Sequence, residues 1–315
     1  MKIVFLGTGE FAVPSLHAVH RAGHEVSLVV SQPDRPKGRG LELKATAVKQ
    51  AAQALGLRVF QPEKLRHESD PVLAESADVL AVVAYGQLLR EDILGCAPRG
   101  AINVHASLLP KYRGAAPIQW ALANGETVTG LTTMQLDRGM DTGPILLQEQ
   151  CGIEPADTTA TLEPRLALVG ALLLVRTLQG LADGSVEPHP QDEARASRAP
   201  LIKKSDGRVD FGATAAQIAN RLRGFSPWPG ISFAHQGRAI KVLAASPLPF
   251  GSSGAEAVPG AILAISRDGV DVACGGGTAL RLERVQPESR SGIAGADFAN
   301  GAKLKVGEIF GSPAE

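Results

Sequence analysis

Cysteine is scarce in this chain of 315 residues, which contains only three, at positions 96, 151 and 274. They form no Cys-x-x-Cys pair, which argues against a disulfide framework or a zinc site and fits a reducing compartment. A net charge of one sign is also lacking, because 32 basic residues balance 32 acidic ones. A nucleic-acid partner would therefore have to be held by local basic patches.

Long apolar runs and targeting segments are lacking as well. No stretch reaches the roughly 18 apolar residues that span a bilayer. Residues 166–178 come closest, but Arg165 and Arg176 flank or interrupt them, which predicts a core helix. Residues 1–7 predict a strand rather than a signal or transit peptide. We expect a cytoplasmic protein with no membrane partner, and a monomer.

The order of the predicted elements indicates an α/β fold. A β-α-β unit is expected over residues 2–31, and further apolar strands at 78–84 and 101–107. Strands at 130–136 and 145–150 are expected to form an antiparallel edge. Together they predict a Rossmann-like N-terminal domain with a mostly parallel sheet.

The character of the sequence changes after residue 184. Prolines and charged residues predict a linker, so the expected domains are a catalytic domain at 1–188, a linker at 189–207 and a C-terminal domain at 208–315. Short strand-like segments with turns between them predict a smaller C-terminal β-barrel of the OB-like kind. Within it, residues 251–257 are expected to form a loose loop.

Polar side chains follow one another along the predicted strand 101–107. Side chains alternate between the faces of a strand, so Asn103, His105 and Ser107 are expected to share one face. A buried parallel strand is normally apolar on both faces, and ligands of open α/β sheets bind beyond the carboxyl ends of the strands. The row therefore indicates a functional site, although neighbouring backbone could also satisfy these groups.

The residue types in this row favour direct group transfer. Asn103 and His105 could donate hydrogen bonds to a carbonyl on which negative charge develops. Asp141, if its Gly-rich loop folds back over the strand end, could orient His105 or a water and accept a proton from an attacking amine. A hydrolase triad with Ser107 is less favoured, because the Gly-x-Ser-x-Gly turn is missing.

Two other segments leave alternatives open. Gly7 and Gly9 could form a dinucleotide-binding turn, but Ala12 replaces the third glycine, and a tight strand-to-helix turn explains the glycines as well. Residues 32–44 predict an irregular loop, either a solvated connection or a basic finger for a phosphate-rich partner. Its basic side chains include Arg35, Lys37 and Arg39.

Three motifs resemble the 10-formyltetrahydrofolate-dependent formyltransferases. They are N-x-H-x-S-L-L-P at 103–110, R-G-A-A-P-I-Q at 113–119 and D-x-G-x-D-T-G at 137–143. The segments QPDRPKGRG at 32–40 and FSPWP at 225–229, and the C-terminal barrel, are similar to the branch of that family that acts on methionyl-tRNA. The resemblance covers nearly the whole chain.

The resemblance implies that Asn103, His105 and Asp141 are catalytic and that the segment Ser107, Leu108, Leu109, Pro110 contacts the folate. It implies transfer of the formyl group of 10-formyltetrahydrofolate, a co-substrate, to the α-amine of initiator methionyl-tRNA. The products would be N-formylmethionyl-tRNA and tetrahydrofolate, and no metal is expected. The expected tRNA contacts are Arg35, Lys37, Arg39, Lys203 and Lys204.

Three rival interpretations stay open. A relative that formylates a small amine, such as glycinamide ribonucleotide or an amino-sugar nucleotide, would use the same asparagine, histidine and aspartate. A nicotinamide-dependent oxidoreductase and a non-enzymatic RNA-binding protein would both leave that set unexplained. The basic loop and the C-terminal domain favour a macromolecular acceptor.

Overall fold

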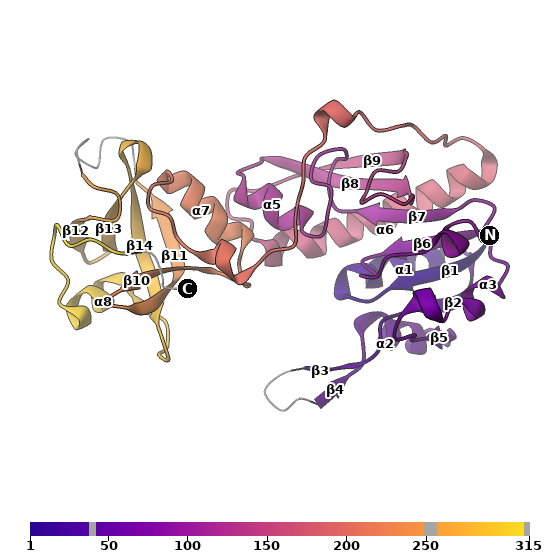
Figure 1. Ribbon diagram of the computed structural model, residues 1–315, viewed down its shortest axis with the longest axis horizontal. Helices are drawn as coiled ribbons and strands as arrows, with labels where there is room; N and C mark the ends of the chain where they lie inside the picture. Colours follow the sequence, from indigo (N-terminus) through magenta and orange to yellow (C-terminus); the bar gives the residue numbers. More distant parts are fainter. Residues whose placement is uncertain (38–41, 249–256, 312–315) are drawn as a thin grey trace. The chain divides into compact units, whose positions relative to one another are not determined.

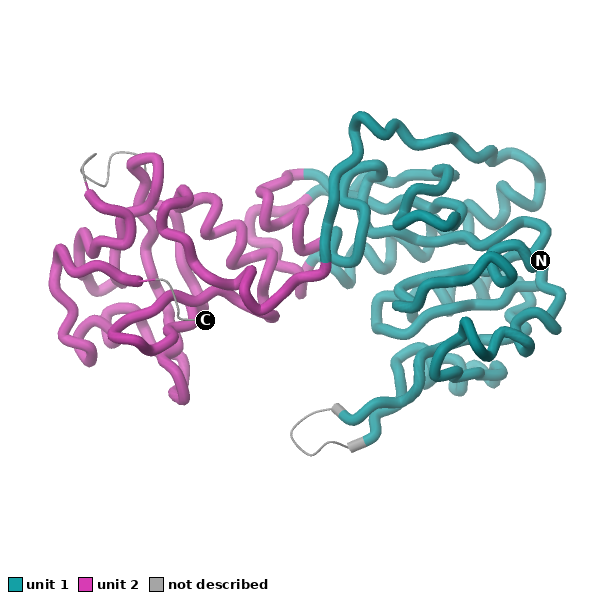
Figure 2. The backbone as a smooth tube through the Cα atoms, viewed as in Figure 1, with its two compact units in different colours: residues 1–117, 128–152, 162–200 teal, residues 118–127, 153–161, 201–315 magenta. Residues whose placement is uncertain are grey.

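The computed structural model describes residues 1–37, 42–248 and 257–311, and it forms two compact units (Figure 2). Unit 1 contains residues 1–117, 128–152 and 162–200, and unit 2 contains 118–127, 153–161 and the chain from 201 onward. The domain limits expected from the sequence stay a prediction. The loose loop expected at 251–257 falls almost entirely outside the described residues.

A seven-stranded sheet forms the centre of unit 1 (Figure 1). Its strands are β1 (Lys2–Gly7), β2 (Glu25–Val30), β5 (Val59–Phe60), β6 (Val79–Val83), β7 (Ala101–His105), β8 (Val128–Gln135) and β9 (Ile145–Gly152). The order is β5-β2-β1-β6-β7-β8-β9, with parallel pairing from β5 to β7 and antiparallel pairing at β8 and β9. This confirms the predicted Rossmann-like, mostly parallel sheet with an antiparallel edge.

The apolar sequences of β1 and β6 explain their central place. Every residue of β6 is buried, and β1 is buried from its second residue onward. Such strands can be stable only where both faces of the sheet are covered. Strand β7 follows β6 and is the last parallel strand before β8 reverses direction, so the carboxyl end of β7 lies where the sheet changes from parallel to antiparallel.

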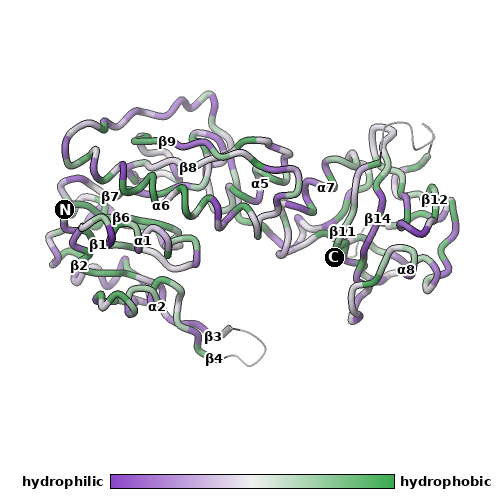
Figure 3. The backbone as a smooth tube through the Cα atoms, turned by 180° about the vertical axis from the view of Figure 1, so that it is seen from behind, coloured by the Kyte–Doolittle hydropathy of each residue, from purple (hydrophilic) through white to green (hydrophobic). Residues whose placement is uncertain are grey.

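Helices cover this sheet. They are α1 (Val13–Arg21), α2 (Ala47–Ala54), α3 (Asp70–Leu73), α4 (Glu91–Leu94) and α6 (Thr159–Asp183). Helix α6 runs along β7 and β8 (Figures 1 and 3), and a Cβ at Gly170 would lie 3.0 Å from the Val104 side chain. By length and composition α6 could cross a membrane, but 56% of its apolar window is buried within the protein. It is the core helix that the sequence predicts.

The segment 32–44 is partly regular, so the prediction of an entirely irregular loop is wrong. Strand β3 (Arg35–Lys37) pairs antiparallel with β4 (Glu42–Lys44), and we call the pair the ribbon. The ribbon is a separate two-stranded sheet, so among the described residues each of its strands has one edge without a partner strand. Pro36 is tolerated there because an edge strand has positions where no N–H is needed.

Unit 2 is built on antiparallel strands. They are β10 (Ile231–His235), β11 (Arg238–Pro247), β12 (Ile262–Ser266), β13 (Gly269–Cys274) and β14 (Thr278–Pro287), in the order β10-β11-β14-β13-β12, with β15 (Ile293–Ala294) beside β14. The helices are α5 (Pro117–Ala123), α7 (Ala215–Gly224) and α8 (Gly295–Ala302). The antiparallel C-terminal domain is confirmed, whereas β15 and α8 were not predicted.

Residues 307–311, which we call the closing segment, join the two edges of the unit 2 sheet. On the β10 side, Ala234 and Gly311 exchange backbone hydrogen bonds of 2.8 and 3.0 Å. On the β12 side, Ile262 exchanges two bonds of 2.8 Å with Gly307 and Glu308. The pairing closes the barrel. No strand was predicted after residue 285, because this segment is short and has a glycine at each end.

Phe310 should be the residue by which the closing segment stabilises unit 2. It is 3% exposed, and its ring centroid lies 4.5 Å from that of Phe233. We expect Phe310→Ala to lower the free energy of unfolding by about 3–5 kcal/mol, because it leaves a cavity. Urea unfolding followed by tryptophan fluorescence measures this, since Trp120 and Trp228 both belong to unit 2.

The neighbouring Ile309 supplies the matched control, because its side chain is 55% exposed. Ile309→Ala should change the free energy of unfolding by less than about 0.5 kcal/mol. If Phe310→Ala lowers the free energy of unfolding as little as Ile309→Ala does, the closing segment contributes backbone pairing alone.

Candidate active site

Asn103 and His105 lie on one face of β7, at alternating positions near its carboxyl end. In the antiparallel ladder with β8, Asn103 lies opposite Met134 and His105 opposite Thr132. The His105 side chain is 6% exposed, and Asn103 is half-buried. Among the described residues the Asn103 side-chain amide makes no hydrogen bond, so its N–H groups can serve a ligand.

The backbone of Tyr112 fixes which nitrogen of His105 is free to act. His105 Nε2 lies 2.9 Å from the Tyr112 carbonyl oxygen. Because a carbonyl oxygen only accepts hydrogen bonds, Nε2 carries a hydrogen and donates it. Nδ1 is then the ring nitrogen that can exchange a proton or donate to a bound group.

Asp141 faces that nitrogen. One of its carboxylate oxygens, Oδ2, lies 3.6 Å from His105 Nδ1 and accepts a hydrogen bond of 2.8 Å from the Gly114 N–H. The Asp141 backbone has a φ of +55°, in the left-handed region that residues with a Cβ rarely adopt. The structure thus brings Asp141 and His105 together at the end of β7.

The segment Ser107–Pro110 forms a turn, so the prediction that the strand continues to residue 107 is wrong. Strand β7 ends at His105, and the Ser107 hydroxyl, fully buried, donates a hydrogen bond of 2.6 Å to the Lys111 carbonyl. Leu109 is buried, whereas Leu108 and Pro110 are partly exposed. A ligand could therefore meet this segment at Leu108, Pro110 or the backbone.

The glycines after β1 have a packing explanation. A Cβ at Gly7 would lie 2.9 Å from both the Ala12 Cβ and the Phe5 ring, whereas a Cβ at Gly9 would meet nothing within 4 Å. The tight strand-to-helix turn therefore accounts for Gly7 without a dinucleotide.

The expected tRNA contacts fall into three groups. Arg35 is exposed on the ribbon, where Asp34, at the base, accepts hydrogen bonds of 2.7 and 2.5 Å from Gln61 and Lys49. Lys37 ends β3, and Arg39 lies outside the described residues. Lys203 and Lys204 are exposed in unit 2.

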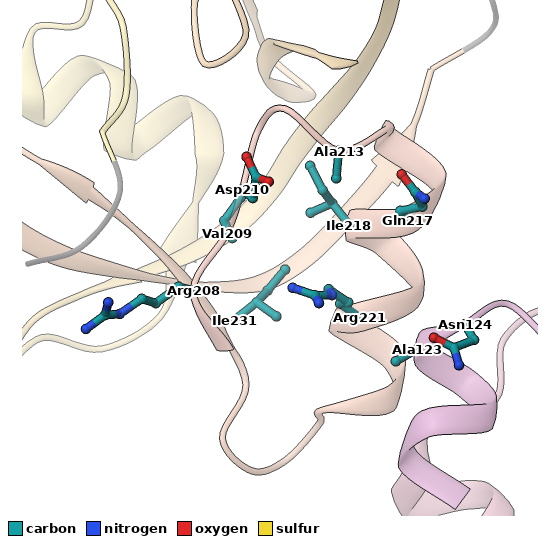
Figure 4. A pocket seen from close by; sticks show the side chains of 10 residues that line it. All are labelled: Ala123, Asn124, Arg208, Val209, Asp210, Ala213, Gln217, Ile218, Arg221 and Ile231. Atoms are coloured by element: carbon teal, nitrogen blue, oxygen red, sulfur yellow. The ribbon is translucent and has the colours of Figure 1, made fainter. Parts of the chain in front are cut away.

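A pocket of about 460 Å³ lies within unit 2 (Figure 4). Arg208, Arg221 and Asp210 contribute charged side chains to its lining, beside apolar Ile218 and Ile231. The residues proposed above from the sequence are not among those that line it.

Sequence reasoning missed three residues that surround the Asp141 loop. Gln191 donates hydrogen bonds to the backbone carbonyls of Asp141 and Gly143, at 2.8 and 2.7 Å. Arg113 holds Gln191 and also contacts Glu193. Gln191 and Glu193 lie in the predicted linker, whose composition gave no signal of a fixed position. Arg113 appeared in the sequence only as part of a motif.

Two family models match the chain. The model described as formyl transferase covers residues 1–178, and the one described as formyl transferase, C-terminal domain, covers residues 201–303.

Curated relatives match over the full length. The chain is 48% identical to the methionyl-tRNA formyltransferase of Solibacter usitatus over 99% of both chains. It is 49% identical to the methionyl-tRNA formyltransferase of Anaeromyxobacter dehalogenans, over 97% of this chain and 98% of that one.

Solved structures share the fold. The N-formyltransferase of Helicobacter canadensis, in complex with folinic acid and dTDP-3-aminofucose, has a TM-score of 0.65 and 17% identity, over 91% of this chain and 99% of that one. HypX of Aquifex aeolicus, in complex with tetrahydrofolic acid, has a TM-score of 0.59 and 16% identity, over 97% of this chain and 48% of that one. At these identities the likeness concerns the fold alone.

Thr132 should be the residue that fixes the turn after β7. Its buried hydroxyl donates to the Ser107 carbonyl at 2.6 Å and accepts from the Leu109 N–H and Gln148 Nε2 at 3.1 and 2.9 Å. We expect Thr132→Val to lower the free energy of unfolding by about 1–3 kcal/mol, because buried polar partners lose their hydrogen bonds. Thermal and urea unfolding measure the effect.

Thr129 is the control on the same strand, because it is 4% exposed and no hydrogen bond of its hydroxyl is found among the described residues. Thr129→Val should leave the free energy of unfolding nearly unchanged. A Thr132→Val protein as stable as the Thr129→Val protein would contradict a structural role for the Thr132 hydroxyl.

Proposed function

We propose that this chain, which belongs to the methionyl-tRNA formyltransferase family of enzymes, transfers the formyl group of 10-formyltetrahydrofolate to the α-amine of methionine on initiator tRNA. The products are N-formylmethionyl-tRNA and tetrahydrofolate. The observation that carries the proposal is the group at the end of β7, where the Asn103 amide lies on the same strand face as His105 and His105 faces Asp141.

Each residue of this group has a role in the proposed reaction. The amine attacks the formyl carbon, and the carbonyl oxygen gains negative charge in a tetrahedral intermediate. The Asn103 amide and the Nδ1–H of His105 in its imidazolium form, whose Nε2–H is donated to the Tyr112 carbonyl, donate hydrogen bonds to that oxygen. Asp141 keeps His105 oriented and assists removal of the proton that the attacking nitrogen loses. Nothing in this scheme requires a metal.

The proposed reaction balances in atoms and charge, and it requires no strong base. A carbon–nitrogen bond forms to the methionine nitrogen, the bond from the formyl carbon to N10 of the folate breaks, and N10 takes up a proton. The ester of the aminoacyl-tRNA withdraws electrons, so the amine has a pKa below the value of about 8 of a free α-amine. Enough neutral amine then exists at neutral pH.

The acceptor is proposed to be a tRNA because of the relatives and the ribbon. The curated relatives that match over nearly the whole chain are named methionyl-tRNA formyltransferase. On the ribbon, Arg35 is exposed beside other basic positions of the sequence. Formylation of a small amine is the second candidate, since the H. canadensis neighbour is in complex with dTDP-3-aminofucose. A cytoplasmic location and a monomeric state stay predictions.

One assay separates the candidates. Labelled 10-formyltetrahydrofolate is incubated with the protein and charged initiator tRNA, uncharged tRNA, glycinamide ribonucleotide or a dTDP-amino sugar. Label in the charged tRNA alone supports the proposal, and label in a small amine supports the second candidate. NAD(P)H turnover without formyl transfer would point to the oxidoreductase.

His105 should be required for the chemical step. We expect His105→Ala to reduce kcat for formyl transfer by at least about 10²-fold, because an oxyanion donor or proton-transfer group is lost. The far-ultraviolet circular dichroism should be unchanged. His67→Ala, which alters an exposed histidine of the same unit, is the control. A normal kcat in the His105 variant would mean that this ring is only structural.

The basic segment 32–44, which includes the ribbon, should act on tRNA binding rather than on the folate. We expect Arg39→Ala to raise KM for charged tRNA and to flatten its log–log salt dependence by up to roughly one unit, because one phosphate contact is lost. KM for 10-formyltetrahydrofolate should not change. Steady-state kinetics at several salt concentrations measures both. Unchanged tRNA kinetics at every salt concentration would leave the segment 32–44 as a solvated connection, with Lys203 and Lys204 as the tRNA contacts.

A further inference from the structure

Residues 189–199, which we call the strap, lie against two loops that face His105. One follows β7 and carries Tyr112, and the other precedes β9 and carries Asp141. At one end, His189 and Ile145 exchange backbone hydrogen bonds of 2.8 Å at the start of β9. At the other end, the Arg113 N–H donates to the Ser197 carbonyl at 2.8 Å, and the Ala199 N–H donates to the Arg113 carbonyl at 2.7 Å. The strap and both loops belong to unit 1.

Gln191, within the strap, joins the two loops by its side chain. Its Nε2 donates to the backbone carbonyls of Asp141 and Gly143, at 2.8 and 2.7 Å. Its Oε1 accepts from Arg113 Nε and Nη2, at 3.0 and 2.8 Å. A guanidinium only donates hydrogen bonds, so the oxygen of the amide must face Arg113 and the nitrogen must face the carbonyls.

Glu193 fixes the other side of the Arg113 guanidinium. Its carboxylate oxygens lie 2.8 and 2.7 Å from Arg113 Nη1 and Nη2, in a bidentate arrangement. The Arg113 side chain is 9% exposed, and this hydrogen bonding holds the pKa of Glu193 below its ordinary value. The contact therefore stays ionised at neutral pH and presents Arg113 to Gln191 in one orientation.

The Asp141 loop needs such a hold. The Asp141 φ of +55° is a left-handed backbone conformation that is unfavourable for a residue with a Cβ and persists only when the surroundings determine it. The hydrogen bond from Gly114 fixes the carboxylate, but not the backbone that carries it. The two carbonyls bound by Gln191 stand on that backbone, at Asp141 itself and at Gly143.

We propose that Gln191, held by Arg113 and Glu193, is a positioning residue that fixes the Asp141 loop so that the carboxylate faces His105. Its role in catalysis rests on the proposed function, whereas its hold on the loop does not. Gln191 touches no reacting atom and acts only through Asp141. A misplacement of about 1 Å at a reacting group can lower a rate about 10²-fold, so the effect is measurable.

The first test compares three variants by kinetics. Gln191→Ala should lower kcat for formyl transfer by about 10- to 10²-fold while KM for each substrate changes little. Gln191→Glu keeps the size but removes both donors, so its kcat should be equally low. Arg195→Ala, an exposed substitution within the strap, is the matched control and should have the kcat of the wild type. A Gln191→Glu enzyme with normal kcat would overturn the proposal.

The second test asks whether Gln191 acts through Asp141. In a double-mutant cycle with Asp141→Asn, the change Gln191→Ala should lower kcat no further, because the group it positions is already inactive. If the double variant loses kcat by the product of the two single losses, Gln191 acts independently of Asp141, and the assignment is overturned.

The third test does not depend on activity. Amide hydrogen exchange of the peptide covering 136–144 should be faster in Gln191→Ala than in the wild type, and unchanged in Arg195→Ala. If the wild type transfers no formyl group, the proposed function is refuted. Faster exchange in Gln191→Ala would still show that Gln191 holds the loop. Exchange equal to that of the wild type would refute the hold itself.

Discussion

The approach of the Asp141 carboxylate to His105 Nδ1, at 3.6 Å, is the constraint on which the rest of the candidate site depends. One partner lies on a central strand, and the other lies on a loop in a left-handed conformation. Neither the strand nor the loop determines this distance alone. It is set by the Tyr112 carbonyl on one side of the ring and by Gly114 on the carboxylate, two residues of the same connection after β7.

Most of unit 1 could be predicted from the sequence because its signals are local. Apolar runs such as 79–83 have to be buried on both faces, and that fixes them as central strands. Pairings between distant residues left no comparable signal. The closing segment at 307–311 is held by hydrogen bonds to Ala234 and Ile262. Its own residues do not show that it pairs with the two edges of the sheet. The ribbon was missed because Pro and Gly obscured a ladder of only three residue pairs.

The candidate site divides in the same way. The placement of Asn103 and His105 on one face follows from alternation along a strand, which a sequence shows directly. Ser107 does not share that face because the chain turns after His105 and the hydroxyl binds the Lys111 carbonyl. Alternation could not reveal this turn, since its Ser107 carbonyl and Leu109 N–H are bound by Thr132, which lies on a neighbouring strand. A side chain that closes a turn and one that meets a ligand look the same in a sequence.

Arg113 explains how a segment with the composition of a linker becomes fixed structure. Its backbone pairs with residues 197–199 of the strap, and its side chain binds Gln191 and Glu193 near the other end. Because the strap is attached to one buried residue at two places, the chain between those places has few accessible conformations. Binding of Gln191 to the Asp141 loop therefore costs little further conformational entropy. Unit 1 ends at residue 200, directly after the strap. The same stretch of chain therefore holds the loop of Asp141, through Gln191, and leads into unit 2.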